Sequence, residues 1–403
     1  MRRCGAIVLI LALGAVSLAG GQTSPGSVLT SVFIGSFPTA EIDVLQKALF
    51  EAYATLPTPR FAVDTYRVRY LSADFDGTSA VVTAELFVPR YSEHSDRPLL
   101  VFGAGTTGIG DACAPSLEQW EVRHFGNYRA NMLAYATQGF IVLFPDYLGF
   151  NDPDRPQRYF SKFAEAHAML DGIRAVFQYF KTAAHPVRPL AKAFVAGCSQ
   201  GGHAAFAAAD LQRSYSPELS LAGVIGFGAT TDVEVLLREG PAYAPFIFYT
   251  YSVMYGLAQI DPSLYLQERF AKSLVQDVTQ LCVDQFQTYY GFDGLKLYRP
   301  EFHRELYGNR LAVSYPFLAE RLAENRSGLG GHGLPCLLLQ GATDFIVSSA
   351  TQLQFLDALR KAGSPVRYIA YEGVAHKGIR QAGFEASVEW MERLARGEAA
   401  PTQ

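Results

Sequence analysis

The chain has 403 residues, of which 49% are hydrophobic, 13% aromatic and 18% charged. This composition is apolar enough to fill a large core and excludes an intrinsically disordered protein. The formal net charge is -4 and no lysine and arginine run marks a nucleic-acid surface, so DNA and RNA are not expected partners.

The chain begins with the pattern of a secretory signal peptide. A positively charged start precedes an apolar run from Ala6 to Ala19, and small residues follow. Cleavage fits after Ala19 or after Gly21, and the run is shorter than the about 20 residues that span a bilayer. We assign residues 1–21 to the signal peptide, with an uncleaved anchor as the alternative, and expect a secreted or periplasmic protein.

From Thr65 onward, strand-like and helical segments alternate. Two β segments separated by turn residues 74–77 predict an antiparallel hairpin. The later alternation predicts a mostly parallel, doubly wound sheet with helices on both faces. The expected strands are Thr65–Leu71, Ala80–Val88, Leu99–Gly103, Phe140–Pro145, Ala193–Ala196, Leu221–Phe227, Cys336–Leu339 and Arg367–Tyr371. The expected helices are Leu117–Gln138, Ala164–Lys181, Gly202–Arg213, Ala350–Ala362 and Phe384–Ala395.

The alternation breaks once, between residues 231 and 333. This stretch has helical patterns crowded with aromatic residues and no strand-like runs. We expect residues 231–333 to form a helical cap inserted in a core made of residues 22–230 and 334–403. The alternative is a plain second helical domain whose aromatic residues form its own core.

A G-x-S-x-G motif occupies residues 197–201, with Ser199 at its centre. The motif alone occurs often by chance, but here it directly follows an apolar strand and precedes an alanine-rich helix. That strand, sharp turn and helix form the nucleophile elbow of serine hydrolases. Ser199 is therefore the predicted nucleophile, with a buried structural serine as the alternative.

A serine nucleophile needs a base and an acid that orients it. His376 follows the last expected strand and precedes the terminal helix, which is where this arrangement places the base. Asp344 lies at the carboxyl end of the preceding strand and is the predicted acid, with Glu372 as its rival. His167 and His203 fall on expected helices and receive no catalytic role, although His203 could line the site.

An oxyanion hole needs two backbone N–H donors. One is expected from Gln200, the residue after the nucleophile, and the other from the glycine-rich loop at residues 103–108. We predict Thr106 as the second donor, with Gly105 and Thr107 as alternatives.

Five cysteines are present, one of them within the predicted signal peptide. Cys198 and Cys336 lie in or beside apolar strands, as buried thiols do. Cys113 and Cys282 lie in expected loop or cap regions and could pair in an oxidising compartment.

Together these motifs resemble the α/β-hydrolase superfamily and, more narrowly, the secretory lipase family of the fungal lipase A type. The resemblance covers most of the mature chain. The segments that carry it, beside the elbow, are Gly105–Gly108, Asp111–Ser116, Asp146–Gly149, Leu170–Ala175, Gly341–Asp344 and Glu372–His376.

The resemblance implies hydrolysis of acylglycerols or other carboxylic esters, a cap that holds the acyl group, and no cofactor. It also implies a bridge from Cys113 to a cap cysteine, for which Cys282 is the candidate. Two departures concern substrate preference: Ala104 stands where the family has histidine, and Cys198 where tyrosine or histidine is usual. Asp146 and Tyr147 could line the oxyanion side or be structural turn residues.

We therefore expect an α/β-hydrolase-fold serine hydrolase that cleaves carboxylic esters, of lipase or esterase type, through an acyl-enzyme on Ser199. The expected partner is a small-molecule or lipid ester, with transient contact to a lipid interface possible. We expect no metal and infer no protein partner. The alternatives are a serine peptidase of the same fold and a non-catalytic binding protein that keeps the fold.

Overall fold

The computed structural model describes residues 24–52, 57–119, 125–152 and 155–400. The predicted signal peptide, residues 1–21, lies outside the described residues. Within the described ranges, none of the helices has the length and apolar character needed to cross a membrane.

The described residues form one nine-stranded sheet in the order β1-β2-β3-β5-β4-β6-β7-β8-β9. β1, β2, β3 and β5 pair antiparallel, and the strands from β5 through β4 to β9 are parallel. The expected mostly parallel sheet and its first hairpin are confirmed. The strands are β1 (Val28–Phe37), β2 (Val63–Ala73), β3 (Ser79–Pro89), β4 (Ser95–Gly103), β5 (Ile141–Pro145), β6 (Val187–Cys198), β7 (Ser220–Phe227), β8 (Cys336–Gly341) and β9 (Val366–Tyr371).

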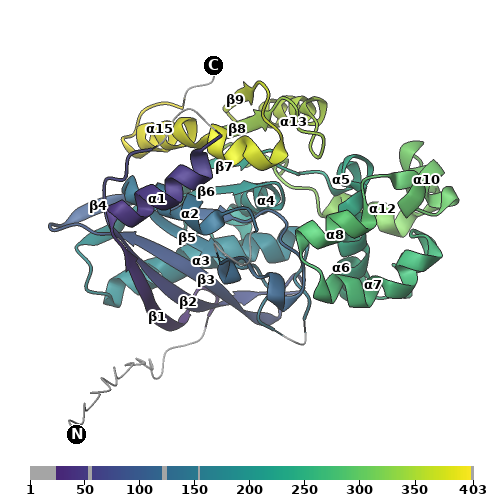
Figure 1. Cartoon of the computed structure of the whole chain (residues 1–403), viewed down its shortest axis with the longest axis horizontal. Coiled ribbons are helices and arrows are strands. Elements are labelled where there is room, and N and C mark those ends of the chain that lie inside the picture. The colour runs from purple at the N-terminus through teal and green to yellow at the C-terminus, as the bar shows by residue number, and fades with distance from the viewer. Residues whose placement is uncertain (1–23, 53–56, 120–124, 153–154, 401–403) are drawn as a thin grey trace, which may run out of the picture.

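Helices cover both faces of the sheet (Figure 1). One face packs against α3 (Lys162–Thr182) and α4 (Gln200–Tyr215), and the other against α2 (Tyr128–Thr137) and α15 (Phe384–Ala395). The central strands are continuous apolar runs; every residue of β5 and of β8 is buried. This is the pattern of parallel strands enclosed between two helical layers.

The expected helix Leu117–Gln138 is wrong at residues 118–119 and 125–127, and residues 120–124 lie outside the described residues. The helix α2 starts only at Tyr128, after Asn127 in the left-handed conformation at φ 58°. The Glu118 carboxylate explains this start, because it accepts hydrogen bonds from the backbone N–H groups of Phe125, Asn127 and Arg129. A side chain thus satisfies donors that a continuous helix would have satisfied internally.

Between β7 and β8 the chain leaves the sheet and forms a helical insertion, which Figure 1 shows gathered at one end of the long axis. A separate hydrophobic cluster holds it together, in which the rings of Phe246 and Phe286 stack at 3.6 Å between centroids. Most of its aromatic residues are therefore the insertion's own core. Its helices are α5 (Val233–Glu239), α6 (Ala244–Tyr255), α7 (Glu268–Gln280), α8 (Val283–Tyr290), α9 (Gly294–Leu297), α10 (Pro300–Tyr307), α11 (Leu311–Ser314) and α12 (Pro316–Glu324).

Candidate active site

Ser199 sits on a sharp turn between β6 and α4. Its backbone has φ 54° and ψ -115°, a strained conformation for a residue with a side chain. The turn is tight because its glycines touch: a Cβ on Gly197 would lie 2.2 Å from the carbonyl oxygen of Gly201, and one on Gly201 would lie 1.9 Å from the carbonyl oxygen of Gly103 in β4. The glycines of the motif thus let the strand and helix close together and hold the serine at the helix N-terminus.

His376 and Asp344 form a buried pair at the ends of β9 and β8. The distance from His376 Nδ1 to Asp344 Oδ2 is 2.6 Å, and the other carboxylate oxygen accepts the backbone N–H groups of Ile346 and Val347. This arrangement fixes the carboxylate, so His376 donates from Nδ1 and leaves Nε2 for chemistry. Gly228 packs directly against this pair, because a Cβ at its position would lie 3.1 Å from Asp344 Oδ2.

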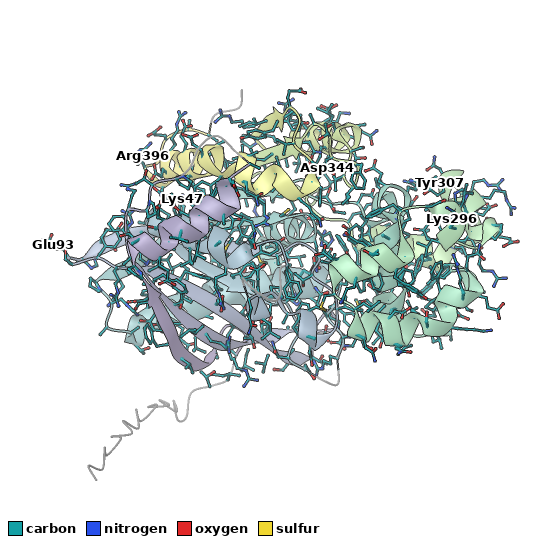
Figure 2. All side chains as sticks on the ribbon, viewed as in Figure 1. Lys47, Glu93, Lys296, Tyr307, Asp344 and Arg396 are labelled. Atoms are coloured by element: carbon teal, nitrogen blue, oxygen red, sulfur yellow. A yellow bond between two sulfur atoms is a disulfide. The ribbon has the colours of Figure 1, made fainter. Side chains whose placement is uncertain are left out.

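The rival acid, Glu372, is exposed and does not contact His376. Figure 2 shows Asp344 between the C-terminal elements and the helical insertion, whereas Lys296 and Tyr307 lie at the insertion's far end. The structure therefore brings Asp344 to His376, as the sequence order predicted.

Ser199 and His376 line the same cavity, of about 230 Å³. In this conformation the serine Oγ lies 3.5 Å from Thr230 Oγ1, and the described residues include no Ser199–His376 hydrogen bond. Catalytic hydrogen bonds are often long without substrate, so rotation of the serine hydroxyl is the step that would complete the contact.

The candidates for the oxyanion donor from the glycine-rich loop differ in their hydrogen bonds and in whether they line the cavity. The N–H of Gly105 donates to the Tyr128 hydroxyl at 2.6 Å, and Thr107 is buried with its carbonyl accepting from Val283. The N–H groups of Thr106 and Gln200 have no acceptor among the described residues, and Thr106 lines the cavity. The unbonded N–H favours Thr106 over Gly105, and its place in the cavity wall favours it over Thr107, which does not line the cavity. A 2.7 Å bond to the Tyr159 hydroxyl orients the Thr106 side chain.

Tyr147 supports this loop, Asp146 supports the following segment that carries Cys113, and neither lines the cavity. Asp146 is fully buried and accepts both the N–H and the hydroxyl of Ser116 at 2.6 Å. Burial raises its pKa to about 7. The Tyr147 hydroxyl donates to the carbonyl of Ala104 at 2.7 Å. Both residues are structural, which is one of the two alternatives from the sequence.

A buried polar cluster behind the elbow was not predicted. Glu165 on α3 accepts a hydrogen bond from the Gln200 side chain at 2.8 Å and lies 2.6 Å from His203 Nδ1. His203 Nε2 donates to the carbonyl of Asn325, just after α12. The first turn of α4 is thereby fixed to α3 and to the end of the insertion. His203 does not line the cavity, and His167 stacks on Tyr215 away from it.

The insertion and the core meet around the cavity. Cys113 and Cys282 form a disulfide with a Cα–Cα distance of 5.4 Å, which ties the loop after β4 to the start of α8. Cys198 and Cys336 are buried free thiols, as expected. The cavity is lined by Gly105, Thr106, Phe125, Gly126, Tyr128, Cys198, Ser199, Tyr243, Val283, Asp284, Gln287, Ile346, His376, Lys377 and Arg380.

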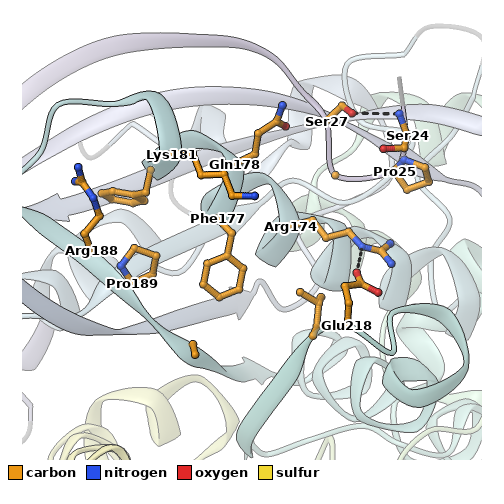
Figure 3. A pocket seen from close by; sticks show the side chains of 14 residues that line it. Ser24, Pro25, Ser27, Arg174, Phe177, Gln178, Lys181, Arg188, Pro189 and Glu218 are labelled. Atoms are coloured by element: carbon orange, nitrogen blue, oxygen red, sulfur yellow. Dashed lines mark hydrogen bonds and ion pairs between the residues drawn. The ribbon is translucent and has the colours of Figure 1, made fainter. Parts of the chain in front are cut away.

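A larger cavity, of about 950 Å³, lies apart from these residues. It is bounded by residues 24–27, by α3 and by the beginning of β6 (Figure 3). Its Arg174 is engaged by Glu218 and Asp171 at 2.6 and 2.7 Å. None of the three predicted catalytic residues lines it, so size alone does not mark the site.

Residues 129–401 match the secretory lipase family. The chain is 26% identical to the secreted triacylglycerol lipase LIP2 of Malassezia globosa over 320 residues, 76% of this chain and 66% of that one. It is also 26% identical to LIP4 of the same organism over 220 residues, 53% of this chain and 45% of that one. The chain therefore spans about half to two thirds of the length of these curated relatives.

Solved structures share the fold. The rice cell wall degrading esterase LipA from Xanthomonas oryzae aligns with a TM-score of 0.73 and 18% identity, covering 93% of this chain and 100% of that one. Candida antarctica lipase A aligns with a TM-score of 0.65 and 18% identity, covering 94% and 84%. These likenesses confirm the expected α/β-hydrolase fold.

Proposed function

Because the chain belongs to the secretory lipase family, we propose that it is a serine hydrolase that cleaves carboxylic esters through an acyl-enzyme on Ser199. The observation that carries the proposal is the buried Asp344–His376 pair, whose histidine lines the same cavity as Ser199. Fold alone would not support it, since the same fold serves many functions.

In the proposed reaction, Ser199 Oγ attacks the ester carbonyl carbon while His376 Nε2 takes the hydroxyl proton. Asp344 stabilises the imidazolium, and the N–H groups of Thr106 and Gln200 bind the developing oxyanion. The tetrahedral intermediate collapses as His376 gives its proton to the leaving alcohol. Water, deprotonated by His376, then attacks the acyl-enzyme and releases the acid and the free serine.

The helical insertion is the proposed cap, as expected for residues 231–333. Tyr243, Val283 and Gln287 reach the cavity from it and form one wall. A cavity of about 230 Å³ is smaller than the pockets of roughly 300–1,000 Å³ that hold drug-sized ligands. In this conformation the cavity fits a short acyl or alcohol group, so we propose esterase-type activity on short esters. Long-chain triacylglycerol hydrolysis would require the cap to move.

Export is part of the proposal. The relatives are named secreted lipases, and the first residues have the pattern of a signal peptide. A disulfide between Cys113 and Cys282 fits an oxidising compartment.

The test is hydrolysis of p-nitrophenyl acetate, butyrate, octanoate and palmitate by the mature chain. Ser199→Ala should reduce the rate by at least about 10⁴-fold with an unchanged melting temperature, because the nucleophile is removed from an intact fold. Ser214→Ala, at an exposed serine on α4, the helix that follows Ser199, is the matched control and should keep full activity. Equal rates in the wild type and Ser199→Ala would overturn the proposal.

A further inference from the structure

Arg380, on the short helix α14 (Ile379–Ala382), forms part of the wall of the catalytic cavity. It is only 4% exposed. Its guanidinium lies over the Tyr128 ring, 4.0 Å from the centroid. Nη1 donates to the Asn131 side chain at 3.0 Å, and Nη2 donates to the carbonyl of Gly126. All of these partners are neutral.

The charge of Arg380 has no counter-ion among the described residues. Each nearby carboxylate is engaged elsewhere: Asp344 by His376, Glu118 by backbone N–H groups and Asp284 by Lys377. A buried charge without an opposite charge is costly, so such groups are normally paired. Guanidinium has five N–H donors, and in the described part of the chain the partners of Arg380 are the Asn131 side chain, the Gly126 carbonyl and the Cys198 thiol, none of which carries a negative charge.

The position of Arg380 relates it to the reacting groups. Tyr128, on which it stacks, accepts the N–H of Gly105 in the oxyanion loop. Burial raises the pKa of Cys198, the neighbour of Ser199, to about 11, and the nearby Arg380 charge partly offsets that rise. The guanidinium thus lies near Cys198 and lines the same cavity as Ser199.

The other charged side chains of the cavity wall do not cancel this charge. Lys377 and Asp284 are both largely exposed and pair with each other at 3.1 Å between Nζ and Oδ1. Among the described residues that line the cavity, Arg380 is therefore a buried positive charge without a matching negative charge.

We propose that the cavity selects esters that carry a carboxylate a few bonds from the ester group, and that Arg380 is the residue that binds this carboxylate. Arginine matches a carboxylate in charge and in planar, two-pronged geometry. The carboxylate could belong to the acyl part or to the alcohol part of the ester, since the cavity adjoins Ser199 without dividing the two sides. The inference rests on the proposed ester hydrolysis and narrows its substrate class.

The test compares anionic esters with neutral esters of similar size. For the acyl side the pair is monoethyl adipate and ethyl hexanoate, followed by ethanol release. For the alcohol side it is 4-acetoxybutanoate and pentyl acetate, followed by acetate release. In the wild type, kcat/KM for the anionic member of at least one pair should exceed that of its neutral partner by about 10-fold or more, as a charge-assisted hydrogen bond allows.

Two variants test whether Arg380 causes the preference for anionic esters. Arg380→Gln keeps hydrogen-bonding capacity without charge and should abolish the preference, measured as the ratio of kcat/KM for the anionic ester to kcat/KM for its neutral partner. Arg380→Lys keeps the charge and should retain part of the preference.

If Arg380→Gln does not fold, the wild type still decides: adipate should inhibit hydrolysis of the neutral esters more strongly than adipamide, and added salt should weaken that inhibition. Neutral esters cleaved as fast as anionic ones, with no inhibition by adipate, would overturn the inference while the proposed function stands. Absence of any ester cleavage would instead remove the proposed function itself.

Discussion

The sheet core and the helical insertion contribute to the site in different ways. The core positions Ser199, Asp344 and His376 through strand ends, glycine contacts and buried hydrogen bonds to the main chain. The insertion has its own aromatic core and reaches the cavity only with side chains. The links between the two regions include Cys113–Cys282, Val283 N–H to Thr107 O, His203 to Asn325 O, Lys377–Asp284, Tyr251 to Phe160 O and Ser348 to Glu239.

The core therefore governs the chemical step, whereas the insertion governs how the substrate is bound. Changes in the core should alter the chemical step, whereas changes in the links should alter stability and substrate binding first. The predictions below test that separation, beginning with the largest expected effect.

Asp344→Asn acts on the core alone and should lower kcat by about 10⁴-fold, because the amide favours the wrong tautomer of His376. Folding should be retained, since an amide fits the same space. The measurement is steady-state hydrolysis of p-nitrophenyl butyrate beside Glu372→Gln, the rival acid, which should remain fully active. Inactivation by Glu372→Gln and survival of Asp344→Asn would reverse the assignment.

Asp146→Asn acts on the support of the segment that carries Cys113. Burial raises the folded-state pKa of Asp146 to about 7 from its ordinary value of 3.8, so the folded chain holds this proton more tightly than the unfolded chain. Its contribution to the free energy of unfolding is therefore largest below about pH 4 and falls as the pH rises to about 7, by up to about 4 kcal/mol.

Asparagine does not titrate, so the stability of Asp146→Asn relative to the wild type should increase across this pH window. Urea unfolding at several pH values measures it. Asp111→Asn, at an exposed carboxylate of the same segment, is the control and should show a much smaller change. A difference between Asp146→Asn and the wild type that does not vary with pH would contradict the prediction.

Replacing both Cys113 and Cys282 by serine acts on the covalent link between the two regions. The bridge spans a sequence separation of 169 residues. Its loss should lower the free energy of unfolding by about 3 kcal/mol, because a long closed loop restrains the unfolded chain. KM should rise more than kcat falls, since the cavity wall loosens while the catalytic residues stay in place.

Thermal unfolding with and without reductant checks this prediction. Reductant should destabilise the wild type and leave the double variant unchanged. A double variant with normal KM but strongly reduced kcat would show that the insertion orders the catalytic residues themselves.

The pair Lys377–Asp284 is the weakest link, since both side chains are exposed. Lys377→Gln should change stability by less than about 1 kcal/mol, as for other surface ion pairs. Any change in KM should disappear at high salt. Lys272→Gln, in an exposed pair on α7 away from the cavity, is the matched control. A large, salt-independent loss of kcat in Lys377→Gln would place this residue in the catalytic machinery.

The sequence predicted those features that depend on a short stretch of neighbouring residues. A strand followed by a turn of fixed composition located Ser199, Asp344 and His376, because each depends on a few neighbouring residues. β1 and the helix α1 (Thr39–Phe50) were not predicted: β1 lies at the edge of the sheet and exposes Val32, Phe33 and Ile34, so it lacks the alternation of a half-buried strand.

The roles of residues whose partners are distant in the sequence could also not be predicted from the sequence. His203 meets a carboxylate 38 positions away and a carbonyl 122 positions away, and Arg380 meets Asn131 at a separation of 249. No local pattern marks such residues, because their surroundings exist only once the sheet, the helices and the insertion have assembled. Similarly, Gly105 was excluded as an oxyanion donor only by its contact with Tyr128, 23 residues later.

The most direct test of the central claim is covalent labelling of the folded mature chain with a fluorophosphonate, which traps activated serines, followed by peptide mass spectrometry. The account predicts one adduct, on Ser199, that is lost in Ser199→Ala and strongly slowed in Asp344→Asn. A folded chain that acquires no adduct, or one modified at another serine while Ser199 stays free, would contradict the assignment of Ser199 as the nucleophile.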